Sequence, residues 1–97
     1  MTKVVVLPEA EEDLAEAALF LELRVTGLGD GLVVEVERSL ARLAKNPYIG
    51  PDMGGGARKL AVRRFPYGLI YRLETERVLI LAVAHHRRRW GYWRNRG

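Results

Sequence analysis

The sequence contains no cysteine, which excludes disulfide bonds, thiolate zinc sites and cysteine nucleophiles. It has only two histidines, and residues 51–97 carry three carboxylate side chains, so no metal site is expected. The N-terminal residues lack the apolar core and small-residue cleavage site of a signal peptide. The apolar run over residues 78–84 is too short to span a bilayer. We therefore expect a cytoplasmic protein with no membrane contact, no metal and no small-molecule cofactor.

Charge is divided unevenly along the 97 residues. Residues 1–50 carry five basic and nine acidic side chains, whereas residues 51–97 carry eleven basic and three acidic ones. Thirteen of the 16 basic residues are arginines, which suit bidentate contacts with phosphates and carboxylates. An arginine-rich composition alone would explain their number but not their segregation. The pattern therefore predicts a polyanionic or acidic partner for the C-terminal half.

The hydrophobic pattern predicts a single domain over residues 1–97, with a strand and a helical hairpin in residues 1–47. Residues 3–7 form a β-branched run that is typical of a strand. Pro8 suits the first position of a helix, and apolar residues then recur at helical spacing as far as Val25. A break at residues 26–30 precedes a second helix, which starts near Asp30 and ends at Asn46 because Pro47 follows. So short a connection predicts two antiparallel helices.

Residues 48–57 are a loop rich in glycine and proline. Three consecutive glycines, Gly54 to Gly56, could indicate a phosphate-binding loop, but no strand precedes them and no Gly-Lys-Ser/Thr follows. We interpret the loop as a flexible link between the helices and a sheet.

Residues 58–89 are predicted to form a three-stranded antiparallel sheet, with strands at 58–64, 67–73 and 78–84. The last strand is apolar at every position, which indicates a central strand covered on both faces. The order β-α-α-β-β-β predicts an α+β fold in which the helical hairpin packs on a mostly antiparallel sheet. Residues 90–97 are expected to be a C-terminal tail, with Arg94 and Arg96 solvated.

Several stretches together resemble the RelE/ParE superfamily of toxins from bacterial type II toxin–antitoxin modules, also known as plasmid stabilisation proteins. They are residues 63–72 (RRFPYGLIYR), 78–84 (VLILAVA), 85–89 (HHRRR), 8–14 (PEAEEDL) and 46–47 (NP). The resemblance covers nearly the whole chain. It implies a cognate antitoxin whose C-terminal segment wraps and inhibits the toxin. It also implies one of two activities, since RelE-like members cut mRNA in the ribosomal A site and ParE-like members inhibit DNA gyrase without nuclease activity.

If the chain is RelE-like, its metal-free endoribonuclease site would include His85, His86, Arg87 and Tyr92. RNA cleavage needs a base, an acid and cations around the phosphate. Adjacent strand residues point to opposite faces, so at most one of the two histidines can enter a given site. The alternative is that each histidine ends the strand with its ring bonded to the backbone.

The position before the Leu-x-Tyr pattern is Gly68, where RelE-like nucleases carry an arginine, so a phosphate contact is missing. Lys59 and Arg63 could replace that contact only if they lie on the same side. We therefore favour the ParE-like interpretation, and a third possibility is a non-toxic binding partner with the same fold.

Arginines interleaved with aromatics suit both stacking on nucleic acid and contact with an acidic antitoxin segment. A solvated tail is the alternative, although exposed tryptophans are unfavourable unless something covers them. The predicted target-binding residues are Lys59, Arg63, Arg64, Arg72, Arg87, Arg88, Arg89, Trp90 and Trp93.

Overall fold

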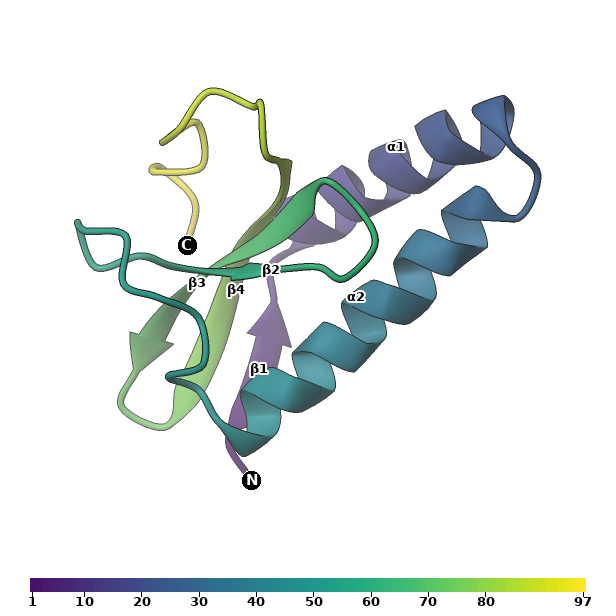
Figure 1. Cartoon of the computed structure of the whole chain (residues 1–97). Helices are drawn as coiled ribbons and strands as arrows, with labels where there is room; N and C mark the ends of the chain where they lie inside the picture. The colour runs from purple at the N-terminus through teal and green to yellow at the C-terminus, as the bar shows by residue number, and fades with distance from the viewer.

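The computed structural model describes residues 1–97 and confirms the predicted order of one strand, two helices and three strands (Figure 1). The elements are β1 (Lys3–Val6), α1 (Pro8–Arg24), α2 (Leu28–Lys45), β2 (Arg58–Ala61), β3 (Tyr67–Glu74) and β4 (Arg77–His85).

The four strands form one mixed sheet in the order β1-β4-β3-β2. The pairs β2–β3 and β3–β4 are antiparallel, whereas β1 is parallel to β4. The sheet is thus mostly antiparallel, as predicted, and the apolar strand β4 is an inner strand. The pairing with β1 stops at Val6 and Ile80, so β4 continues to His85 with no strand on that side.

Two boundaries differ from the prediction by two or more residues. Strand β2 ends at Ala61 rather than residue 64, because the Val62 N–H bonds the Tyr67 carbonyl and closes a turn in which Arg64 has a φ of 70°. Helix α2 begins at Leu28 rather than near Asp30. The Glu22 carboxylate accepts hydrogen bonds from the Gly27 and Gly29 N–H groups, which supports this early start.

Both helices cover one face of the sheet, as Figure 1 shows. The core on that side includes Leu32, Val36 and Leu43 of α2 with Leu69 and Ile80 of the sheet. Neither helix combines the length and apolar character that a bilayer crossing requires.

Residues 90–97, which we call the tail, do not extend into solvent. The other face of the sheet carries Ile70, Leu79 and Leu81, which no helix covers. The tail packs on this face through Trp93, which is only 6% exposed. The predicted solvated state of Arg96 is therefore wrong, because Arg96 bonds α1 and β4. Burial of apolar strand surface explains the difference.

Candidate functional site

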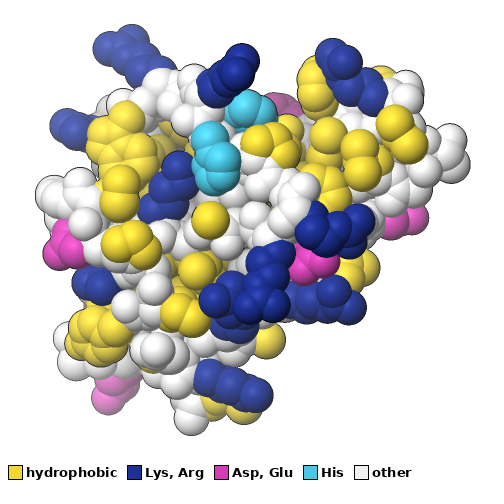
Figure 2. Space-filling view, viewed as in Figure 1, with side chains coloured by type: hydrophobic (Ala, Val, Ile, Leu, Met, Phe, Trp, Pro, Cys, Tyr) yellow, Lys and Arg dark blue, Asp and Glu magenta, His cyan; other side chains and the backbone are white.

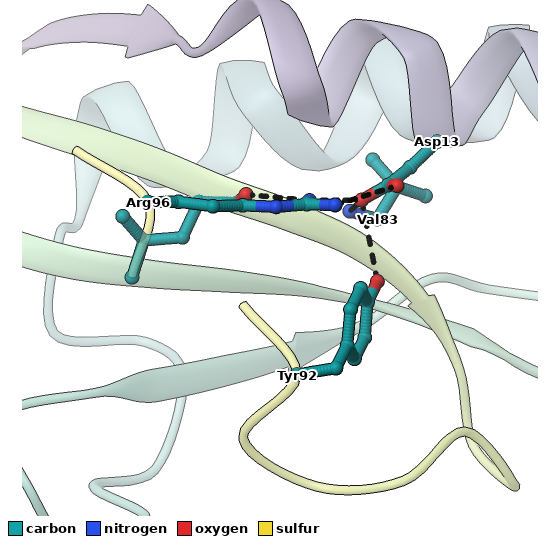
Figure 3. A network of polar contacts seen from close by, with 5 residues as sticks. Asp13, Val83, Tyr92 and Arg96 are labelled. Carbon is teal, nitrogen blue, oxygen red and sulfur yellow. Dashed lines mark hydrogen bonds and ion pairs between the residues drawn. The ribbon is translucent and has the colours of Figure 1, made fainter. Parts of the chain in front are cut away.

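Asp13 of α1 joins the tail to the sheet (Figure 3). Its Oδ2 atom accepts hydrogen bonds from the Val83 N–H at 3.1 Å, the Tyr92 hydroxyl at 3.2 Å and Arg96 Nη1 at 2.6 Å. Its Oδ1 atom accepts a bond from Arg96 Nη2 at 3.3 Å. Arg96 Nη1 also donates to the Leu81 carbonyl at 3.1 Å. Side chains thus satisfy backbone groups of β4 where β1 no longer pairs with it.

The same network fixes the protonation of Tyr92. Burial, together with the nearby Asp13 carboxylate, raises the pKa of Tyr92 to about 12. The hydrogen bond to Asp13 also raises the pKa of Arg96. At neutral pH the Tyr92 hydroxyl is therefore protonated and donates to a carboxylate. An acid or base with its pKa far from neutral is poorly matched to proton transfer at pH 7.

The two histidines have different neighbours, and only His85 belongs to β4, because His86 begins the turn that follows the strand. The His85 ring lies edge-on to the Tyr67 ring, with centroids 5.1 Å apart, and its Nδ1 atom accepts the Arg87 N–H at 3.0 Å. His85 thus makes the ring-to-backbone bond that was the alternative to a catalytic role. His86 is exposed, and its pKa is lowered by desolvation and by the positive charge of Lys59.

Lys59 lies directly over Gly68. A Cβ atom added to Gly68 would come within 2.6 Å of Lys59 Cε, so the glycine leaves room for the lysine stem. Lys59 and His86 are near enough for the lysine charge to act on the imidazole. Lys59 thus lies where it could replace the missing contact, and that role stays a prediction for both Lys59 and Arg63. Arg63 lies in the exposed turn that follows β2.

The eleven basic residues of the C-terminal half divide into two groups. Five of them bond to other parts of the chain: Arg58, Arg64, Arg72, Arg77 and Arg96. Six make no ion pair and no side-chain hydrogen bond: Lys59, Arg63, Arg87, Arg88, Arg89 and Arg94. Lys and Arg side chains are spread over several parts of the face in Figure 2 rather than gathered in one patch.

Three predicted target-binding residues are engaged within the protein. Arg64 reaches the nearly buried Glu35 carboxylate of α2 at 3.4 Å. Arg72 bonds Glu74 at 3.1 Å and the Gly97 carbonyl at 3.0 Å. Trp93 is buried, so little of its surface is open to a macromolecular target. The binding roles of the exposed residues in that set stay predictions.

Two hollows flank the tail. The helix-side hollow, of about 280 Å³, lies between α1 and the tail and brings together His85, Arg88 and Tyr92 with Asp13 and Glu16. The glycine-loop hollow, of about 450 Å³, lies between residues 54–56 and the tail. No group of three or more side chains among His, Cys, Asp and Glu is placed to hold a metal ion.

Sequence reasoning missed Asp13. It is one of several acidic residues near the start of α1, but it lies three residues after Ala10 and four before Ala17, and both alanines are buried. A carboxylate on the buried face of a helix needs a partner. The spacing of Asp13 from the two alanines was therefore the sequence signal that could have identified it as a bonded carboxylate.

An apolar patch lies over the end of the helical hairpin that is remote from the chain termini (Figure 2). It comprises Leu19, Phe20, Leu23 and Val25, whose exposed fractions are 60%, 50%, 79% and 57%. The Arg24 guanidinium lies 4.3 Å from the centroid of the Phe20 ring. Exposed apolar clusters of this kind mark protein-binding surfaces.

Comparison with known proteins identifies the family. No curated protein shows significant sequence similarity to this chain. A solved structure described as "Chromosomal ParDE TA system from P. aeruginosa" aligns with a TM-score of 0.77 over 88% of this chain and 96% of that chain, at 18% identity, and so shares the fold. The family described as "ParE toxin of type II toxin-antitoxin system, parDE" matches residues 4–90. Because this match spans most of the sequence, the chain belongs to the ParE toxin family, within the RelE/ParE superfamily that the sequence resembles.

Proposed function

We propose that this protein is a toxin that inhibits DNA gyrase and is neutralised by a cognate antitoxin. The observation that carries the proposal is the ParE family match over residues 4–90. The exposed cations Arg87, Arg88 and Arg89, which directly follow β4, are the residues that we assign to the gyrase or gyrase–DNA complex.

The site geometry supports the non-nuclease alternative over mRNA cleavage. The Tyr92 hydroxyl donates a hydrogen bond to Asp13, and its pKa is raised to about 12. His85 and Tyr92 line the helix-side hollow, whereas His86 is not among its lining residues and lies within reach of the Lys59 charge. Of the four groups proposed for an endoribonuclease, the hollow therefore brings together only His85 and Tyr92, and Tyr92 is poorly matched to proton transfer at neutral pH.

We place the antitoxin on the apolar patch of α1. A segment with its own apolar side chains would cover Leu23 and Val25, which are more than half exposed. Acidic residues beside those side chains would match Arg24. Apolar anchors weaken little with salt, whereas charge contacts weaken as the ionic strength rises. We expect the complex to survive moderate salt during co-purification, and replacing Leu23 by Asp should reduce co-elution of the antitoxin.

The decisive experiment compares two activities of the purified chain. Plasmid supercoiling by gyrase should be blocked, and ribosomes carrying mRNA should show no new cuts. Inhibition of supercoiling should be abolished in the triple variant Arg87→Gln, Arg88→Gln and Arg89→Gln. A matched control, Arg24→Gln with Arg38→Gln and Lys45→Gln, changes the net charge equally on exposed helical positions and should keep it.

Two outcomes would contradict the proposal. Ribosomal mRNA cuts that disappear in Tyr92→Phe or His85→Ala would establish the RelE-like activity instead. Unchanged growth after induced expression without the antitoxin would indicate a non-toxic binding partner.

A further inference from the structure

The glycine-loop hollow has no role in the proposed function, yet its walls combine three kinds of ligand-binding group. Its lining includes the tryptophans Trp90 and Trp93, the arginines Arg72 and Arg94, and the glycines Gly54 to Gly56. It opens on the sheet face that the helices leave free. Lys59, which lies over Gly68, is not among its lining residues.

The tryptophan pair gives the hollow a fixed aromatic surface. The two rings meet edge to face at 5.1 Å between centroids, with planes at 84°. Trp93 is buried against the sheet and holds Trp90, which stays 41% exposed. An indole held in place and partly open to solvent can stack on a planar ligand at little cost in side-chain freedom.

The two arginines that line the hollow can form charged contacts with an anion. Arg94 is exposed and forms no ion pair, so its guanidinium is available to a ligand. Arg72 bonds Glu74 and the Gly97 carbonyl through one nitrogen, Nη2. The Glu74 carboxylate is shared with Arg77, and hydrogen bonds from both arginines lower its pKa. Each Arg72 donor other than Nη2 is free of hydrogen bonds within the protein.

The glycine loop adds backbone donors. Gly54, Gly55 and Gly56 have φ angles of 88°, 62° and 80°, and a Cβ atom at any of them would meet nothing within 4 Å. The glycines are therefore required by the left-handed backbone and not by crowding. The Gly54 N–H bonds Asp52, whereas the Gly55 and Gly56 N–H groups bond nothing in the protein. Free amides in such turns commonly bind anions.

We propose that the glycine-loop hollow binds a nucleotide. The base stacks on Trp90, and the phosphate lies among Arg94, Arg72 and the Gly55 and Gly56 amides. A volume of about 450 Å³ is in the range of small-molecule sites. A peptide carboxylate would engage one guanidinium and leave the amides unmatched, whereas the several oxygens of a phosphate can meet both. The ligand is either a free nucleotide or an unstacked nucleotide of a single strand, which share this chemistry.

Intrinsic fluorescence tests this directly, because the only two tryptophans of the chain both line the hollow. The full chain is titrated with AMP, with a short thymidine oligonucleotide and with inorganic phosphate. We expect saturable changes with AMP or the oligonucleotide and binding of phosphate that is at least tenfold weaker. Tighter binding of the oligonucleotide would identify a strand as the ligand, and tighter binding of AMP would identify a free nucleotide.

Variants locate the site. Arg94→Ala and Trp90→Leu should each weaken binding about tenfold, in line with the loss of one charge contact or one stacked base. Lys45→Ala removes one positive charge from the exposed end of α2 and should change affinity by less than about twofold. The amide NMR signals of Gly55 and Gly56 should shift with AMP in the unmodified chain.

The proposal is overturned if phosphate binds as tightly as AMP, if Arg94→Ala and Lys45→Ala weaken binding equally, or if only an acidic peptide alters the fluorescence. These assays contain no gyrase, so their failure is distinct from a failure of the proposed toxin activity.

Discussion

The tail contains two tryptophans and two arginines within seven residues. One residue of each type packs or bonds within the protein, and the other is exposed. Trp93 is 6% exposed and Arg96 is bonded to Asp13, whereas Trp90 is 41% exposed and Arg94 bonds nothing through its side chain. The inward pair attaches the tail to the sheet, and the outward pair is available to ligands. A cluster of arginine and aromatic residues can therefore be half structural and half functional. Substitutions that compare the two pairs test this division.

The largest effect is expected from the tryptophans. Trp93→Ala should lower the free energy of unfolding by about 3–5 kcal/mol, because it leaves a large cavity against Ile70 and Leu81. Trp90→Ala should lower it by less than about 1 kcal/mol, because the side chain is partly exposed. Urea unfolding of both variants measures the difference. Equal losses would mean that both side chains hold the tail.

The next effect is expected at Asp13. Replacing it by Ala removes the acceptor of bonds from Val83, Tyr92 and Arg96, and should cost about 2–3 kcal/mol of unfolding free energy. The neighbouring Glu12→Ala is the matched control, since Glu12 is exposed and forms no ion pair. Unfolding by urea at pH 7 should separate the two variants clearly. If the tail were attached by Trp93 alone, both would resemble the unmodified chain.

A smaller effect concerns Tyr92 and has a defined pH range. Its folded pKa of about 12 exceeds the ordinary value of about 10, so its contribution to stability is complete below pH 10 and is lost as the pH rises to 12. Tyr92→Phe should lose about 1 kcal/mol at pH 8 and show a weaker alkaline decline. Tyr48→Phe, at a residue that is 70% exposed, serves as the control. Identical alkaline curves for the Tyr92 variant and the unmodified chain would count against the bond to Asp13.

The smallest effect is expected at His86 on the open face of the sheet. Its folded pKa is lowered, so the unfolded chain binds the proton more readily. Stability that is present above about pH 6.5 should therefore decline as the pH falls through the folded pKa. His86→Gln should remove that part of the decline, by less than about 0.5 kcal/mol, in thermal unfolding between pH 5 and 7.5. No change in the pH profile would show that neither desolvation nor the charge of Lys59 shifts the His86 pKa.

The sequence predicted the fold well because each element has a local signal. Pro8 and the acidic residues after it indicate the start of α1, and the unbroken apolar run over 78–84 indicates an inner strand. The ends of β2 and the start of α2 were less accurate. They depend on a turn closed by Val62 and Tyr67 and on the Glu22 carboxylate, which are contacts that periodicity does not report.

The candidate site was less predictable because it depends on contacts between distant residues. The direction of Trp93 follows from an apolar sheet face that the helices do not cover, and this becomes apparent only when the strands are assembled. Arg96 and Asp13 lie 83 positions apart, so no local pattern links them. The end of β4 has the same effect, because His86 falls in the turn after the strand and strand alternation does not fix its direction.

The separation of Asp13 and Arg96 also has a consequence for the order of events during synthesis. Helix α1 leaves the ribosome early, but its carboxylate lacks its guanidinium partner until nearly all of the domain has been translated. Until Arg96 docks, the Leu81 carbonyl of β4 lacks its side-chain donor, whereas the Val83 N–H requires only Asp13. A chain whose tail has not yet packed therefore keeps an open acceptor on this strand edge, and docking of the tail closes it.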